Sequence, residues 1–160
     1  MIIRLRRIVQ APKSDIKVGS WHSGKVPKAD FPMARQAYGL GTSYRWCVIS
    51  FVALGVECKV LVVFNAGKQK FEAILGAIVS GALRVLCSYE YHPSEPGWHC
   101  HAACDNVAKV PNGYMRGPWV KRIPHAKRAH KRQDFDIKDE LSAQRFAFKC
   151  YKIEVEGSLL

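Results

Sequence analysis

Apolar and polar positions alternate in two different ways through the middle of the chain. Residues 44–53 and 59–65 are dense in aromatic and β-branched side chains, a composition typical of buried strands. Across residues 66–82 the apolar side chains instead recur every three or four positions, which favours an amphipathic helix. The side chains that form this stripe are Phe71, Ile74, Leu75, Ile78 and Val79. The pattern therefore predicts strand, strand and helix, in that order.

The flanking segments complete the expected set of elements. Residues 83–92 and 98–104 have the composition of two further strands, and the intervening PSEPG predicts a hairpin. Near the N-terminus, residues 2–9 are a candidate edge strand within an otherwise irregular segment. Towards the C-terminus, Asp134 and Asp136 favour the start of a helix that runs to about Ile153, because acidic side chains stabilise helix N-termini.

This order predicts an α+β fold, an antiparallel sheet of four or five strands with two helices packed on one face. We expect residues 1–160 to form a single domain, with an irregular basic segment at about 1–45 and a basic loop at about 106–133. The most apolar stretch, residues 46–56, is too short to span a bilayer. The six cysteines lack framework spacing and are expected to be reduced. Together these features predict a cytoplasmic protein that does not enter a membrane.

Charge changes the picture, since 25 lysines and arginines face only 13 acidic residues and give a net charge of +12. Such an excess points to a polyanionic partner. The segment 106–133 contains no acidic residue, and its aromatic side chains suit stacking on unpaired bases of single-stranded nucleic acid. The candidate nucleic-acid-binding residues are Arg116, Trp119, Lys121, Arg122, Lys127, Arg128, Lys131 and Arg132.

Candidate chemistry is concentrated in residues 90–105, EYHPSEPGWHCHAACD. If residues 98–104 form a strand, His99 and His101 project to one side about 7 Å apart, close enough to share a metal ion. Cys100 and Cys104 then point to the core on the other side. Glu90 or His92 is the candidate third ligand. A five-residue hairpin loop would turn both of these away from the two histidines, whereas a four-residue loop or a bulge would bring them to the same side.

The pattern His, apolar residue, His on a strand of a basic protein resembles the HUH endonuclease superfamily of replication initiators, relaxases and related transposases. The resemblance covers residues 98–103, with Cys100 at the apolar position. It implies that His99 and His101 bind a divalent metal, Mn²⁺ or Mg²⁺, together with a third polar ligand. It also implies a tyrosine on a later helix that attacks the phosphate of single-stranded DNA and becomes covalently linked to it. Tyr151 is the first candidate for this tyrosine and Tyr114 the second.

Two functions of other classes stay open at this point. The chain can be a non-catalytic basic module that binds nucleic acid or a ribonucleoprotein, as small proteins encoded by phages or mobile elements do. It can also be an adaptor that docks an acidic protein surface. The salt dependence of nucleic-acid binding separates the adaptor from the other two functions, because phosphate contacts release counterions.

Overall fold

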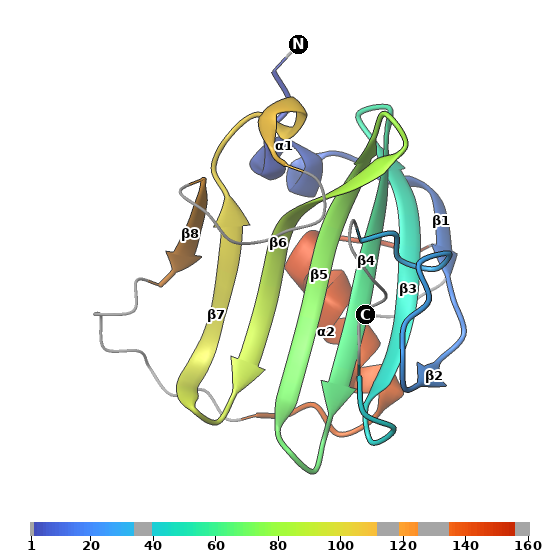
Figure 1. Cartoon of the computed structure of the whole chain (residues 1–160), viewed down its shortest axis with the longest axis vertical. Coiled ribbons are helices and arrows are strands. Elements are labelled where there is room, and N and C mark those ends of the chain that lie inside the picture. The colour runs from blue at the N-terminus through green and yellow to red at the C-terminus, as the bar shows by residue number, and fades with distance from the viewer. Residues whose placement is uncertain (1, 34–39, 112–118, 125–134, 156–160) are drawn as a thin grey trace.

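The computed structural model describes residues 2–33, 40–111, 119–124 and 135–155. Over these residues the chain forms an eight-stranded antiparallel sheet with strand order β1-β3-β4-β5-β6-β7-β8, and β2 pairs with β3 (Figure 1). The strands are β1 Ser14–Val18, β2 His22–Ser23, β3 Arg45–Ala53, β4 Val56–Asn65, β5 Lys70–Val79, β6 Ala82–His92, β7 Glu95–Ala103 and β8 Val120–Ile123. The helices are α1 Leu5–Gln10, the 3₁₀ turn η1 Val107–Lys109 and α2 Glu140–Tyr151.

Tight turns connect the central strands, so neighbours in sequence are also neighbours in the sheet. Leu54 and Gly55 join β3 to β4 with φ of 54° and 73°, and Ser80 and Gly81 join β5 to β6 with φ of 52° and 76°. Two consecutive residues with positive φ match the twist of antiparallel strands, and glycine adopts this conformation at little cost. The result is a simple meander from β3 to β7.

Both faces of the central sheet are covered, each by a different part of the chain. On the helix face, α1 and α2 pack onto the alternating side chains of the strands, with Ile8, Phe148 and Tyr151 almost fully buried (Figure 1). On the other face, which we call the N-terminal face, Val26 and Phe31 are buried against a second cluster. That cluster comprises Trp46, Leu61, Val63, Ile74, Leu83 and Val85 from the sheet.

The predicted fold class is wrong in its strand count and in its helices. The described residues contain eight strands rather than four or five, because the N-terminal segment contributes β1 and β2, the segment 66–82 contributes β5, and the segment predicted as a basic loop contributes β8. Of the two α-helices, α1 has only six residues and replaces the strand expected at residues 2–9. Leu5, Ile8 and Val9 are spaced to share one side of a helix, and this side packs onto the sheet.

The helix predicted at residues 66–82 is strand β5 because both of its sides are buried. Phe71, Ala73, Leu75 and Ala77 contribute to the helix face, while Ile74 contributes to the N-terminal face. The sequence of a strand that is covered on both faces is almost continuously apolar. It therefore fits the spacing of a helix as well as that of a strand. Pairing with β4 and β6 in the folded sheet makes this segment a strand rather than a helix.

The C-terminal helix is present but starts later than predicted. Asp139 is its N-cap, accepting a hydrogen bond from the backbone of Ser142 at 2.8 Å, and Ser142 Oγ accepts one from the backbone of Asp139 at 3.0 Å. Asp136 lies outside any helix, before this capping box, and Asp134 lies outside the described residues. Reciprocal capping satisfies two backbone groups at once, so it outweighs an isolated acidic residue upstream.

Within the described residues, no helix is both long enough and apolar enough to cross a membrane.

Candidate metal centre

Three candidate ligands converge where β6 meets β7 on the N-terminal face. Strand pairing sets Glu90 opposite His99, and Ser88 opposite His101. Directly opposed residues in an antiparallel pair project to the same face. Consequently one ligand atom each from Glu90, His99 and His101 lies within 4.8 Å of the other two. His99 and His101 thus face the same way, as the alternation of the sequence predicts.

An irregularity in the hairpin determines that Glu90 joins the two histidines. The regular pairing of Glu90 with His99 is followed by His92 paired with Glu95, so residue 91 on β6 is set against residues 96–98 on β7. Gly97, with φ of 97°, lies inside this β-bulge. The bulge is the arrangement that brings Glu90 to the side of His99, and it resolves the question that the loop length left open.

The spacing of the ligand atoms fits a first-row divalent ion. Glu90 Oε2 lies 3.4 Å from His99 Nε2, 3.5 Å from His101 Nε2 and 3.9 Å from His92 Nε2. Ligand atoms held about 2.0–2.1 Å from a tetrahedral ion are separated by about 3.3 Å. The carboxylate therefore lies at a coordinating distance from each imidazole, and a small movement of the rings would complete a three-ligand site, since all three ligand atoms lie within 4.8 Å of one another. His92 is the more distant fourth candidate.

Neighbouring groups orient this cluster. Ser88 Oγ donates to Glu90 Oε1 at 2.9 Å, which leaves Oε2 directed at the imidazoles. The His99 ring lies between those of His92 and His101, with centroid separations of 5.1 and 5.3 Å. His99 Nδ1 makes a long contact of 3.5 Å with the carbonyl oxygen of Gly97. A carbonyl only accepts, so this contact favours a proton on Nδ1. Nε2, which faces Glu90, is then the nitrogen that a metal ion would bind, and without a metal it can donate to the carboxylate when the ring carries both protons.

Burial and charge act in opposite directions on the carboxyl group. Burial raises the pKa of Glu90, but hydrogen bonds from His99 and Ser88 and the positive charges of His101 and His99 outweigh it and bring the pKa below its ordinary value. The carboxylate form is the one that binds a metal. The fold therefore places an ionised ligand beside two imidazoles in a largely covered position, where the His99 side chain is only 1% exposed.

One cation of the basic region lies next to the cluster. Arg122 on β8 is paired with His101 on β7, so both residues belong to the N-terminal face. Its guanidinium Nη1 donates to the carbonyl of Pro124 at 3.3 Å. The neighbouring Lys121 is paired with Ala102 and projects to the helix face instead. Of these two candidate nucleic-acid-binding residues, Arg122 lies across from His101 on the face of the metal ligands, and Lys121 lies on the opposite face.

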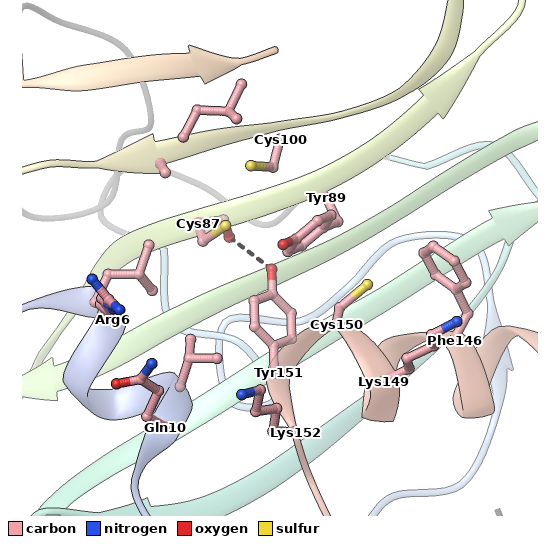
Figure 2. A pocket seen from close by; sticks show the side chains of 14 residues that line it. Arg6, Gln10, Cys87, Tyr89, Cys100, Phe146, Lys149, Cys150, Tyr151 and Lys152 are labelled. Carbon is pink, nitrogen blue, oxygen red and sulfur yellow. Dashed lines mark hydrogen bonds between the residues drawn. The ribbon is translucent and has the colours of Figure 1, made fainter. Parts of the chain in front are cut away.

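Tyr151, the first candidate nucleophile, is not brought to the cluster. It lies on the helix face, beyond the sheet from Glu90 and the histidines, and is 1% exposed. Figure 2 shows it at the end of α2, with its hydroxyl directed at Cys87. Its hydroxyl donates to the backbone oxygens of Ala73 and, at 3.3 Å, Cys87. Burial raises its pKa well above the ordinary value for a tyrosine. In this position the side chain ties α2 to β5 and β6.

The remaining candidates of the basic loop are only partly described. Trp119 is half-buried and packs against the core of the helix face. The others lie outside the described residues. These are Tyr114, Arg116, Lys127, Arg128, Lys131 and Arg132.

The two cysteines next to the histidines differ from each other. Cys100 is buried on the helix face, as predicted, and pairs opposite Tyr89. The prediction that Cys104 is buried there is wrong, because β7 ends at Ala103 and Cys104 is exposed after it. Once the strand has ended, alternation no longer decides where a side chain points.

Sequence reasoning missed Ser88 as a member of this site. Its signal was present, since Ser88, Glu90 and His92 alternate with apolar or aromatic residues along one strand. That alternation predicts a polar row facing the same side as the histidines, provided that the register across the hairpin is known. The register depends on the bulge, which no residue pattern specifies by itself.

Searches against protein-family models, curated proteins and solved structures find no match to this chain. The case for function therefore rests on the residues themselves.

Proposed function

We propose that this protein binds a divalent transition-metal ion through Glu90, His99 and His101 and acts on the phosphate backbone of single-stranded nucleic acid. The observation that carries the proposal is the convergence of the three ligand atoms within 4.8 Å on one face of the β6–β7 hairpin. Two imidazoles and one carboxylate form a donor set that occurs in catalytic metal sites. A divalent ion bound there would supply Lewis-acid polarisation of a phosphodiester group.

The donor set also selects among metals. Mg²⁺ prefers oxygen ligands and keeps several waters, imidazole nitrogens suit Fe²⁺ and Zn²⁺, and Mn²⁺ accepts a mixed set of nitrogen and oxygen ligands more readily than Mg²⁺ does. Of the two ions that the HUH resemblance implies, we therefore favour Mn²⁺. Titration of metal-free protein with Zn²⁺, Mn²⁺ and Mg²⁺ in a calorimeter should give one site that binds Zn²⁺ most tightly, Mn²⁺ less tightly and Mg²⁺ most weakly.

Two features support phosphate as the group on which the site acts. The chain carries a net charge of +12, which attracts a polyanion over a long range. Close to the ligands, Arg122 adds a permanent positive charge beside His101. A guanidinium matches the geometry of two phosphate oxygens and would hold a phosphodiester against the cluster.

The central test is cleavage of labelled single-stranded DNA and RNA by the full chain, with and without Mn²⁺. Glu90→Gln and His101→Gln should lose metal binding and cleavage, since each removes one ligand from a largely covered cluster. Glu57→Gln and His22→Gln are matched controls, because both residues are exposed on strands outside the site. The proposal fails if the controls and the site variants lose metal binding to the same extent.

Cleavage and binding separate the proposed enzyme from a binding module. Tight metal binding and salt-dependent nucleic-acid binding without any cleavage would leave the non-catalytic module, in which the metal organises the binding face. Metal binding without affinity for nucleic acid would favour the adaptor of an acidic protein surface. A covalent adduct with DNA would point to a tyrosine nucleophile, and Tyr114→Phe then tests the candidate that lies outside the described residues.

A further inference from the structure

A second concave surface lies on the helix face, beyond the sheet from the metal ligands. It is a cleft of about 570 Å³ between α1, α2 and strands β6 to β8 (Figure 2). Clefts of roughly 300–1,000 Å³ are typical of small-molecule sites. Nothing in the proposed metal chemistry uses this cleft, so its shape and lining call for a separate explanation.

The walls of the cleft are predominantly apolar. Leu5 and Val9 line it from α1, Phe146 from α2, and Cys100 and Ala102 from β7. Ile123 on β8 completes the wall and is 53% exposed, which makes it one of the large apolar side chains that the fold leaves in solvent. Leu5, Val9 and Phe146 are partly exposed beside it, so the apolar surface of the cleft is continuous, which is typical of a binding site.

Charges around the cleft have one sign. Arg6 comes from α1, and Lys149 and Lys152 come from α2 and its C-terminal end (Figure 2). Among the described residues that line the cleft, none is aspartate or glutamate. An apolar cavity with cations and no carboxylate is complementary to a molecule that combines an apolar body with an anionic head.

We propose that this cleft binds a single-chain amphiphilic anion, a long-chain carboxylate of the fatty-acid class, with its chain against Leu5, Val9 and Ile123 and its carboxylate towards the cations. Such a ligand satisfies both features of the cleft at once. Nucleic acid satisfies only the charge, because it offers no aliphatic chain for the apolar walls. The site lies on the helix face and is independent of Glu90, His99 and His101.

The apolar part of the cleft is tested by measuring how tightly the full-length protein binds straight-chain carboxylates of eight to twelve carbons. Affinity, measured by calorimetry below the micellar concentration, should rise about fourfold for each added methylene until the cleft is full. Dodecanol should bind about five- to tenfold more weakly than dodecanoate, since it lacks the charge that pairs with the cations. Affinity that does not depend on chain length, or equal affinity for alcohol and carboxylate, would overturn the proposal.

Variants of the cations separate this site from a general attraction to a basic surface. Replacing Arg6, Lys149 and Lys152 together by Gln should remove the advantage of dodecanoate over dodecanol. Replacing Lys17, Lys28 and Lys138 by Gln changes the net charge by the same amount at exposed positions outside the cleft and should leave that advantage intact. Equal effects of the two triple variants would refute the site.

A substitution in the apolar part of the cleft gives a second, independent test. Ile123→Glu at a half-exposed position should preserve folding, checked by circular dichroism, and reduce dodecanoate affinity at least tenfold by adding a like charge to the wall. Anionic phospholipid vesicles distinguish a free acyl carboxylate from a membrane surface. Binding to vesicles without saturable binding of monomeric dodecanoate would contradict the proposal.

Discussion

Ser88 contributes no ligand atom to the Glu90–His99–His101 cluster, yet its hydroxyl holds one carboxylate oxygen of Glu90 at 2.9 Å. At the scale of single residues, such a contact decides which oxygen faces the imidazoles. Removing a group that orients a metal ligand in this way typically lowers metal affinity about 10- to 100-fold. Ser88 is therefore a positioning residue of the proposed site.

We expect Ser88→Ala to weaken Mn²⁺ binding about tenfold, because Glu90 then lacks the hydrogen bond that fixes its orientation. Ser88→Thr keeps the hydroxyl and should restore most of the affinity. Calorimetric titration of metal-free protein measures both effects. An Ala variant that binds Mn²⁺ as tightly as the wild type would show that the carboxylate needs no such support.

Tyr151 illustrates the opposite case, a side chain whose role is structural. Its ring is buried and its hydroxyl donates to two strand carbonyls, those of Ala73 and Cys87. Tyr151→Phe leaves these buried acceptors without the hydroxyl and should cost about 1–2 kcal/mol of unfolding free energy. Any cleavage activity should persist in the folded variant, because the hydroxyl does not reach the metal ligands. Urea unfolding and the strand-cleavage assay, run on the same sample, measure both. Loss of cleavage with unchanged stability would restore Tyr151 as the nucleophile.

At the scale of elements, the close packing of strand β5 against β6 depends on a glycine. Gly76 has no side chain to clash with its neighbour across the β5–β6 pair, and a Cβ there would lie 2.6 Å from Leu83 Cδ1 and 2.7 Å from its Cγ. Leu83 is itself 1% exposed and packed in the cluster on the N-terminal face. The glycine therefore leaves the space above β5 that the side chain of Leu83 fills.

We expect Gly76→Ala to destabilise the protein by about 1–3 kcal/mol, because Leu83 must move within a packed core. Whether the substitution lowers or raises the free energy of unfolding tests whether this segment is a buried strand or an exposed helix. In an exposed helix the same change would stabilise the chain by about 0.5–1 kcal/mol. Thermal and urea unfolding measure the difference, and Gly41→Ala is the control, since its nearest neighbour lies 3.9 Å away.

The strands and helices also show which parts of the fold could be predicted from the sequence. Aromatic and β-branched composition located β3, β4 and β6, and the hairpin turn after β6 together with the apolar side chains around the histidines located β7. It failed at β5 because burial on both faces removes the alternation that identifies a strand. The common orientation of His99 and His101 followed from spacing alone. The third ligand did not, because Glu90 and His99 meet only through the register and bulge of the hairpin.

At the scale of the whole molecule, charge and fold combine to present different chemistry on the two faces of the sheet. The N-terminal face carries the histidine cluster with Arg122, and the helix face carries the apolar cleft with Arg6, Lys149 and Lys152. The net charge of +12 attracts a polyanion to either face. Short-range contacts then determine where it binds.

Nucleic-acid affinity should fall steeply with salt, because each neutralised phosphate releases counterions. Changing Lys121, Arg122, Lys127 and Arg128 together to Ala should weaken binding to a single strand. It should also flatten the plot of log affinity against log salt by about 0.7 for every phosphate that the variant no longer neutralises. The same binding assay on the Lys17, Lys28 and Lys138 variant is the control. If the slope is unchanged in the first variant, the binding face lies elsewhere, most simply at Arg4, Arg6 and Arg7.

The alternation of β6 and β7 limits how these strands can change in length. Successive residues serve opposite faces, so His99 and His101 belong to the metal cluster while Cys100 and Ala102 belong to the cleft and core. Removing one residue between the bulge and Ala103 would exchange the two sets, sending imidazoles into the apolar interior and a thiol towards Glu90. A substitution in these strands therefore alters one face at a time, whereas a single-codon insertion or deletion here should disrupt both faces at once. In the course of evolution, this hairpin could lengthen only in steps of two residues or at its turn.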